Sequence, residues 1–376
     1  PEKEEKILIP FIKRLLELSV KERRKLLPTI RELQWIKGKF SETFCDHHRA
    51  RFLGAVQFVC GNKREMDLGY HIDFNLLCKL LSLYTPSWLA EYINDAESYL
   101  NFNISYEQLM QLIDMGYMQE LSPKRIAQIL PSYICIRSSI PKGKDTFNSD
   151  LLLKREITLK EHIWYLFEQE SSIGYHNDRA QTAYKEGTTS RDESFSAAFY
   201  RFSLDGHLDR NQLLRATLST FNRSFKKDMV NWFAGLFEEL QPRAEELISL
   251  QEEIMQVFTS PYTKPVNVML QQLKKIASEG GFHYQEFIER ATTLFFSSPK
   301  NSLLTIYSIF EQIVAGHPEM KEACCIPLCQ LFLKKDESLP ALYQSTETHP
   351  LLHCKRHCYL TNPRCSRAYR IYLFLS

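Results

Sequence analysis

Residues 204–242 read LDGHLDRNQLLRATLSTFNRSFKKDMVNWFAGLFEELQP. Within them, apolar side chains recur at i, i+3, i+4, i+7, i+8 and i+11. These positions are Met229, Trp232, Phe233, Leu236, Phe237 and Leu240. Because about 3.6 residues complete one helical turn, this spacing places all of them on one face of an α-helix. We therefore expect a helix here that buries the stripe.

The start of the same stretch predicts another helix. Asp209 is a residue type that caps helix N-termini, and Gln212, three positions later, completes a capping box. We expect that helix to end at Lys226-Lys227, because cations suit the negative end of the helix dipole. Asp228 then offers a cap for the helix that follows.

The pattern continues as far as Leu333, because residues that break or cap helices divide the chain into further apolar segments of helical period. The dividing positions are Gln241-Pro242, Ser260-Pro261, Pro265, Gly280-Gly281, Ser298-Pro299 and Pro318. Pro327 is expected to kink or split the last helix. Helix pairs recur about every 35–40 residues, which is typical of HEAT-like or armadillo-like repeats. The predicted fold is all-α: an α-solenoid of antiparallel helix pairs.

The N-terminal part also has helical patterning. Ser19 and Glu22 form a capping box, and the apolar pattern that follows continues to Trp35. A third helix, which includes Phe44, is expected between a cap at Ser41 and Gly61. The 13 glycines among 376 residues are about half the usual frequency, which agrees with a mostly helical chain.

The middle of the chain is more polar than the helical segments on either side. Residues 137–150 and 171–194 are polar, and we expect loops or a domain boundary there. We accordingly divide the chain into an N-terminal helical domain (1–136), a helix with polar loops or a linker (137–200), a helical-repeat domain (201–335) and an irregular tail (336–376).

The tail is basic and rich in cysteine and histidine. Its possible metal ligands are His349, His353, Cys354, His357, Cys358 and Cys365. Sulfur and imidazole at Cys-x3-Cys spacing can chelate zinc, but the paired Cys-x2-Cys motifs of a typical zinc site are missing. The alternatives are a disordered or non-native tail and a small strand-bearing cap. Its cations and tyrosines can also contact RNA or anionic lipid.

Six motifs carry a resemblance to a known family. They are Leu204 to Arg210, Leu213-Leu214, Trp232-Phe233, Leu240-Gln241-Pro242, Glu245-Glu246 and, more weakly, Leu18 to Lys25. In these residues the chain resembles the bacterial domain-of-unknown-function family 6493, best over 200–335. The resemblance implies a helical-repeat protein, usually longer than this chain, and supplies no activity and no catalytic residues.

Neither net charge nor hydropathy indicates a nucleic-acid or membrane ligand. The formal net charge is +2, and five basic residues lie in 349–376, so the rest of the chain is close to neutral. A near-neutral body binds a phosphate backbone poorly by charge alone. The sequence shows no apolar leader and no run of 18 apolar residues, from which we expect a soluble, cytoplasmic protein without membrane contact. Because the chain starts at Pro1 rather than Met, we expect a processed, trimmed or fragmentary N-terminus.

Candidate functional residues gather at the turn before residue 210. Asp205, His207 and Asp209 can present metal ligands, or the two carboxylates can cap and turn the chain while His207 bonds to the backbone. Together with Arg210 and Trp232, they are the candidate binding residues. Trp232 is either a binding hot spot or a core residue of its helix. We predict no catalytic residue, metal or cofactor, since motifs such as G-x-S-x-G, the P-loop and H-E-x-x-H are absent.

Three functions remain open on these observations. The first is a helical-repeat scaffold that binds a protein partner along a concave surface. The second is a HEAT-like protein that binds nucleic acid, which requires a basic stripe on that surface. An enzyme ranks third. The partner and the oligomeric state are not predicted.

Overall fold

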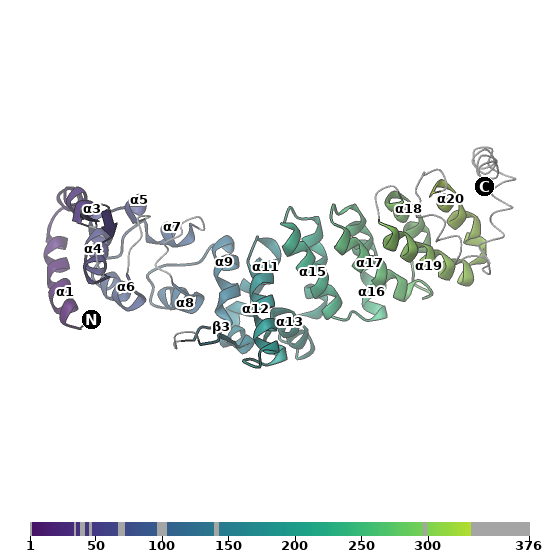
Figure 1. Ribbon diagram of the computed structural model, residues 1–376, viewed down its shortest axis with the longest axis horizontal. Coiled ribbons are helices and arrows are strands. Elements are labelled where there is room, and N and C mark those ends of the chain that lie inside the picture. The colour runs from purple at the N-terminus through teal and green to yellow at the C-terminus, as the bar shows by residue number, and fades with distance from the viewer. Residues whose placement is uncertain are drawn as a thin grey trace. The chain divides into compact units, whose positions relative to one another are not determined.

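The described residues are mostly helical (Figure 1). The computed structural model describes residues 2–33, 35–37, 42–44, 47–66, 72–95, 104–138, 143–295 and 299–331. Among them are twenty α-helices, six 3-10 helices and two short antiparallel hairpins, which confirms the all-α class. The tail predicted from residue 336 lies outside the described residues. In the part of the chain that the structure describes, no helix combines the length and apolar character needed to cross a bilayer.

Two units of similar size make up the chain: unit 1 is Pro1–Glu193 and unit 2 is Ser194–Ser376. The domain boundaries expected from the sequence stay predictions.

Unit 1 is built from short helices. Its α-helices are α1 (Glu2–Glu17), α2 (Val20–Arg24), α3 (Leu27–Leu33), α4 (His47–Cys60), α5 (Lys63–Met66), α6 (Phe74–Leu81), α7 (Leu89–Asn94), α8 (Tyr106–Asp114), α9 (Pro123–Tyr133), α10 (Glu156–Lys160), α11 (Tyr165–Glu168) and α12 (Ile173–Lys185). Its 3-10 helices are η1 (Ser149–Lys154), η2 (His162–Trp164) and η3 (Arg191–Glu193). The hairpins pair β1 (Trp35–Lys37) with β2 (Glu42–Phe44), and β3 (Cys135–Ile136) with β4 (Thr146–Phe147).

Local signals in unit 1 are partly confirmed. Ser19 and Glu22 form the predicted capping box at the start of α2. Two expectations are wrong. Trp35 lies in a strand opposite Phe44, so the helical pattern ends earlier than predicted and the next helix starts later, at His47. The polar stretch 171–194 is not a loop throughout, because Ile173–Lys185 form α12.

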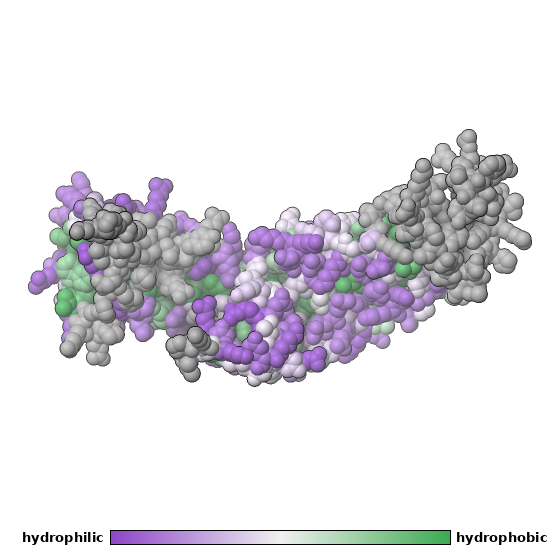
Figure 2. All heavy atoms as spheres, in the orientation of Figure 1, coloured by the Kyte–Doolittle hydropathy of each residue, from purple (hydrophilic) through white to green (hydrophobic). Residues whose placement is uncertain are grey.

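One face of α1 is apolar and exposed. Leu8, Ile12 and Leu15 are buried, whereas Ile7 and Phe11 are 70% and 41% exposed. Figure 2 shows hydrophobic surface along this helix.

Unit 2 consists of longer helices. They are α13 (Phe195–Leu204), α14 (Arg210–Ser219), η4 (Thr220–Asn222), α15 (Lys227–Glu239), α16 (Ala244–Gln256), η5 (Val257–Thr259), α17 (Thr263–Ile276), α18 (Tyr284–Leu294), α19 (Lys300–Gly316), η6 (Pro318–Met320) and α20 (Lys321–Leu331). Helix α20 runs through Pro327 without being split. Lys226, not Asp228, occupies the N-cap of α15, and Asp228 lies in its first turn.

The helices of unit 2 contact one another in two series. Helices α13, α15, α17 and α19, which we call the odd layer, contact one another in that order. Helices α14, α16 and α18 form the even layer, in which α14 contacts α16, and η5, directly after α16, contacts α18. Each even-layer helix also packs against the odd-layer helix that follows it in sequence. The apolar stripes of both layers therefore share one core.

That core is rich in phenylalanine. Phe233 and Phe237 of α15 are fully buried, as the stripe in the sequence predicts, and Phe225 stacks on Phe233 with 6.4 Å between ring centroids. Phe287 and Phe310 join α18 to α19 with rings in an edge-to-face arrangement at 6.0 Å. Such pairs fix helix positions as well as burying area.

Candidate functional site

The turn between α13 and α14 is held by capping. Gly206 adopts φ +77°, and the His207 amide donates to Phe202 O at 2.9 Å. Asp209 is the N-cap of α14, since its Oδ1 accepts from the Gln212 amide at 2.6 Å. The His207 ring meets Phe202 edge-on at 5.9 Å. Asp205, His207 and Asp209 are all exposed, but the structure does not bring their ligand atoms together.

Arg210, the fourth candidate, has a structural partner. Its guanidinium pairs with Glu246 of α16 and also donates to Leu240 O at 2.8 Å. The residue thus ties the start of α14 to the end of α15 and to the start of α16.

Trp232 is partly a core residue and partly accessible for binding. Its ring packs edge-on against Phe233, with centroids 4.9 Å apart, yet the residue is only half-buried. It contributes to the core and keeps part of its surface on the odd layer.

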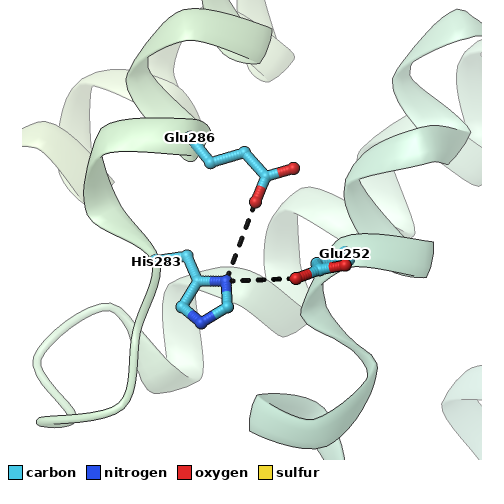
Figure 3. A group of neighbouring side chains, drawn as sticks. All are labelled: Glu252, His283 and Glu286. Atoms are coloured by element: carbon cyan, nitrogen blue, oxygen red, sulfur yellow. Dashed lines mark ion pairs between the residues drawn. The ribbon is translucent and has the colours of Figure 1, made fainter.

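A different group of side chains converges at the even layer. Glu252 of α16, His283 and Glu286 of α18 each offer one ligand atom, and these atoms lie within 4.8 Å of one another (Figure 3). His283 Nδ1 is 3.7 Å from Glu252 Oε1 and 3.7 Å from Glu286 Oε2. No other group of three or more His, Cys, Asp or Glu side chains converges in this way among the described residues.

Two neighbours hold this group in place. The His283 amide donates to Gln251 Oε1 at 2.7 Å, and Gln251, only 2% exposed, donates from Nε2 to Gly281 O at 3.0 Å. On the other side, Arg290 binds Glu286 Oε1 at 2.7 Å, so that Oε2 is the oxygen facing His283. The backbone of the turn and one carboxylate are thereby fixed.

Sequence reasoning missed this group. His283-x-x-Glu286 is visible as a local pair, but Glu252 lies 31 positions earlier and reaches it only because Gln251 binds the turn after α17 to α16. Chemically, the group can act as an imidazolium between two carboxylates, or as three ligands for a metal ion.

Unit 1 contains a buried polar network of another kind. The Tyr106 hydroxyl lies 2.8 Å from Thr158 Oγ1 and 2.7 Å from His162 Nδ1. Burial raises the pKa of Tyr106 to about 12 and lowers the pKa of His162. These hydrogen bonds and shifts favour uncharged side chains that join α8 to α10 and η2, and we interpret the network as structural.

Comparison with known proteins adds a family and no activity. The model of the family described as Domain of unknown function (DUF6493) matches residues 1–301. No curated protein and no solved structure matches the chain.

Proposed function

The chain belongs to the DUF6493 family, and from the geometry of its helices we propose that it is a helical-repeat scaffold of the bacterial cytoplasm that binds a protein partner. Support for the repeat comes from unit 2. Successive even-layer helices start at Arg210, Ala244 and Tyr284, 34 and 40 residues apart, and each pairs with the next odd-layer helix. A spacing of roughly 34–47 residues is typical of TPR, HEAT and armadillo arrays.

The observation that carries the proposal is a difference between the two surfaces of unit 2. On the even layer, charged side chains pair across helices, as Arg215 does with Glu253 and Arg210 with Glu246. On the odd layer, two bonds that join α17 to α19 are neutral: Gln271 Nε2 donates to Thr305 Oγ1 at 2.9 Å, and Ser302 donates to Asn267.

The middle of the odd layer also presents accessible side chains suited to an interface. Exposed or half-buried positions there include Trp232, Asn267, Gln271, Asn301, Leu304 and Ser308. Protein interfaces are depleted of charge at their centre and enriched in tryptophan. An amide-rich surface with one accessible tryptophan matches this composition better than the ion-paired surface of the even layer.

Binding of nucleic acid stays the second candidate. Helix α17 carries Lys264, Lys274 and Lys275, a charge pattern that attracts phosphate. The same layer carries Glu238 and Glu239 at the end of α15 and Glu311 on α19, so both signs are present. Mixed charge favours the protein partner.

Capture by the full-length chain tests the proposal. The tagged protein is compared with an odd-layer variant, Asn301→Arg with Ser308→Arg, in a bacterial lysate with and without nuclease treatment. The control carries Gln285→Arg with Thr293→Arg on α18, which adds the same charge to the even layer. We expect the wild type and the control to retain the same stoichiometric protein, and the odd-layer variant to lose it.

Two results would contradict this expectation. Equal capture by both variants would remove the odd layer as the binding surface. Binding that disappears with nuclease and weakens with salt would favour nucleic acid instead.

A further inference from the structure

We propose that Glu252, His283 and Glu286 form a binding site for a divalent transition-metal ion, with Zn²⁺ as the ion that fits best. The site is independent of the partner proposed above, because it lies on the even layer. Its ligands come from α16 and from the start of α18, two segments joined otherwise by Gln251 and by packing.

Two of the three distances between ligand atoms are close to those of a metal site, and all three are within 4.8 Å. Tetrahedral zinc, with bonds of about 2.0–2.2 Å, holds its ligand atoms roughly 3.3–3.6 Å apart. His283 Nδ1 is already 3.7 Å from one oxygen of each glutamate. Glu252 is 62% exposed and can move by the small amount that is needed, while water completes the coordination.

The surroundings fix the other two ligands. Arg290 holds Oε1 of Glu286, which leaves Oε2 for the ion, and the Gln251 amide holds the backbone of His283. Partners that orient the ligands in this manner are a regular feature of protein metal sites.

The ligand set selects the class of ion. One imidazole with two carboxylates suits zinc and similar transition metals, whereas Ca²⁺ and Mg²⁺ prefer sites made of oxygen alone. Binding requires Nδ1 of His283 to be unprotonated, with the proton on Nε2, and it would replace the two contacts between Nδ1 and the glutamate oxygens.

Hydrogen exchange of the full-length chain, with and without added Zn²⁺, tests the proposal at the site itself. A zinc count alone does not suffice, because the residues after 348 include further cysteines and histidines. We expect Zn²⁺ to slow exchange of the amides in 281–287 of the wild type. His283→Gln and Glu252→Gln should each abolish that protection, and Glu289→Gln, an exposed acid on the same helix, should retain it.

The outcomes are decisive in either direction. Protection that is lost in both ligand variants and kept in the Glu289 control supports the site. Absence of Zn²⁺-dependent protection in the wild type, or its persistence in His283→Gln, overturns it and leaves the histidine as an ion-pair partner. Circular dichroism of each variant verifies that the helices are intact.

Discussion

Arg210 holds Glu246 through both carboxylate oxygens: Nε lies 2.5 Å from Oε1 and Nη2 lies 3.0 Å from Oε2. Glu246 also accepts from the Arg243 amide at 2.8 Å, so one carboxylate caps α16 and binds α14. Burial alone would raise the pKa of Glu246, but the bonds from Arg210 and the Arg243 amide outweigh it and hold the pKa below its ordinary 4.5. Arg210, which the sequence suggested for partner binding, thus stabilises the fold.

Removing this pair should cost stability. The two side chains are only 16% and 22% exposed, so Arg210→Ala should lower the free energy of unfolding by about 1–3 kcal/mol. Arg210→Lys should recover only part of this loss, because an ammonium cannot bind both oxygens in the same plane. Urea denaturation followed by circular dichroism measures both changes.

Arg215 on the same helix provides the matched control. It pairs with Glu253 of α16, but these side chains are 46% and 34% exposed. Arg215→Ala should therefore cost only about 0–1 kcal/mol. Equal losses in the two variants would show that burial does not set the strength of these bridges.

Gln251 should be as important for the turn that carries His283. In Gln251→Leu, the His283 amide and Gly281 O both lose the buried side chain that binds them, and the loss of two hydrogen bonds should cost about 1–3 kcal/mol. The same substitution should accelerate hydrogen exchange of the backbone amides in 281–284. Gln256→Leu, an exposed change on the same helix, is the control and should leave that exchange unaltered; unchanged exchange in Gln251→Leu would contradict the role assigned to its amide.

Stability should fall as the pH drops through the range where histidine titrates. Burial lowers the pKa of both His162 and His176 below the ordinary 6.5, so the unfolded chain binds more protons than the folded chain below that pH. Above the pKa of the histidines in the unfolded chain, this difference in proton binding does not change the free energy of unfolding. As the pH falls below that pKa, it lowers the free energy of unfolding. The carboxylates with shifted pKa values, such as Glu107 and Glu246, titrate below 4.5 and stay charged.

Unfolding free energies at about pH 7.5 and about pH 5.5 measure this effect. The double variant His162→Gln with His176→Gln should show a weaker pH dependence than the wild type. His207→Gln, which replaces an exposed histidine, should not. An undiminished pH dependence in the double variant would place the titrating groups elsewhere.

The sequence predicts helices well where large apolar residues set the period and poorly where they do not. Phe233 and Phe237 form a strong stripe, and both are buried as expected. After Ile173, helix α12 instead buries small or polar residues, with Asn177, Ala180 and Ala183 at helical spacing. Such a face produces almost no hydropathy signal, which is why its segment resembled a loop.

The candidate site shows a different limit of sequence reasoning. Local spacing relates His283 to Glu286, but nothing local relates either of them to Glu252. Their meeting depends on how α16 packs beside the turn at Gly281, which is a property of the tertiary structure. Conversely, the acidic residues around His207 are close in sequence and do not converge.

The turn before α14 offers a last prediction, because capping and ligand binding give opposite expectations there. If Asp209 acts as an N-cap, Asp209→Ala should lower the free energy of unfolding by about 0.5–2 kcal/mol, since the Gln212 amide loses its acceptor. Asp209→Asn should retain most of the stability because asparagine caps equally well. Asp205→Ala, at an exposed position outside both helices, should change it by less than about 0.5 kcal/mol. A metal site in this turn would instead make the two aspartates equivalent, with loss of either removing a metal-dependent increase in stability. Thermal unfolding of the three variants with and without Zn²⁺ separates these cases, and we expect the order set by capping.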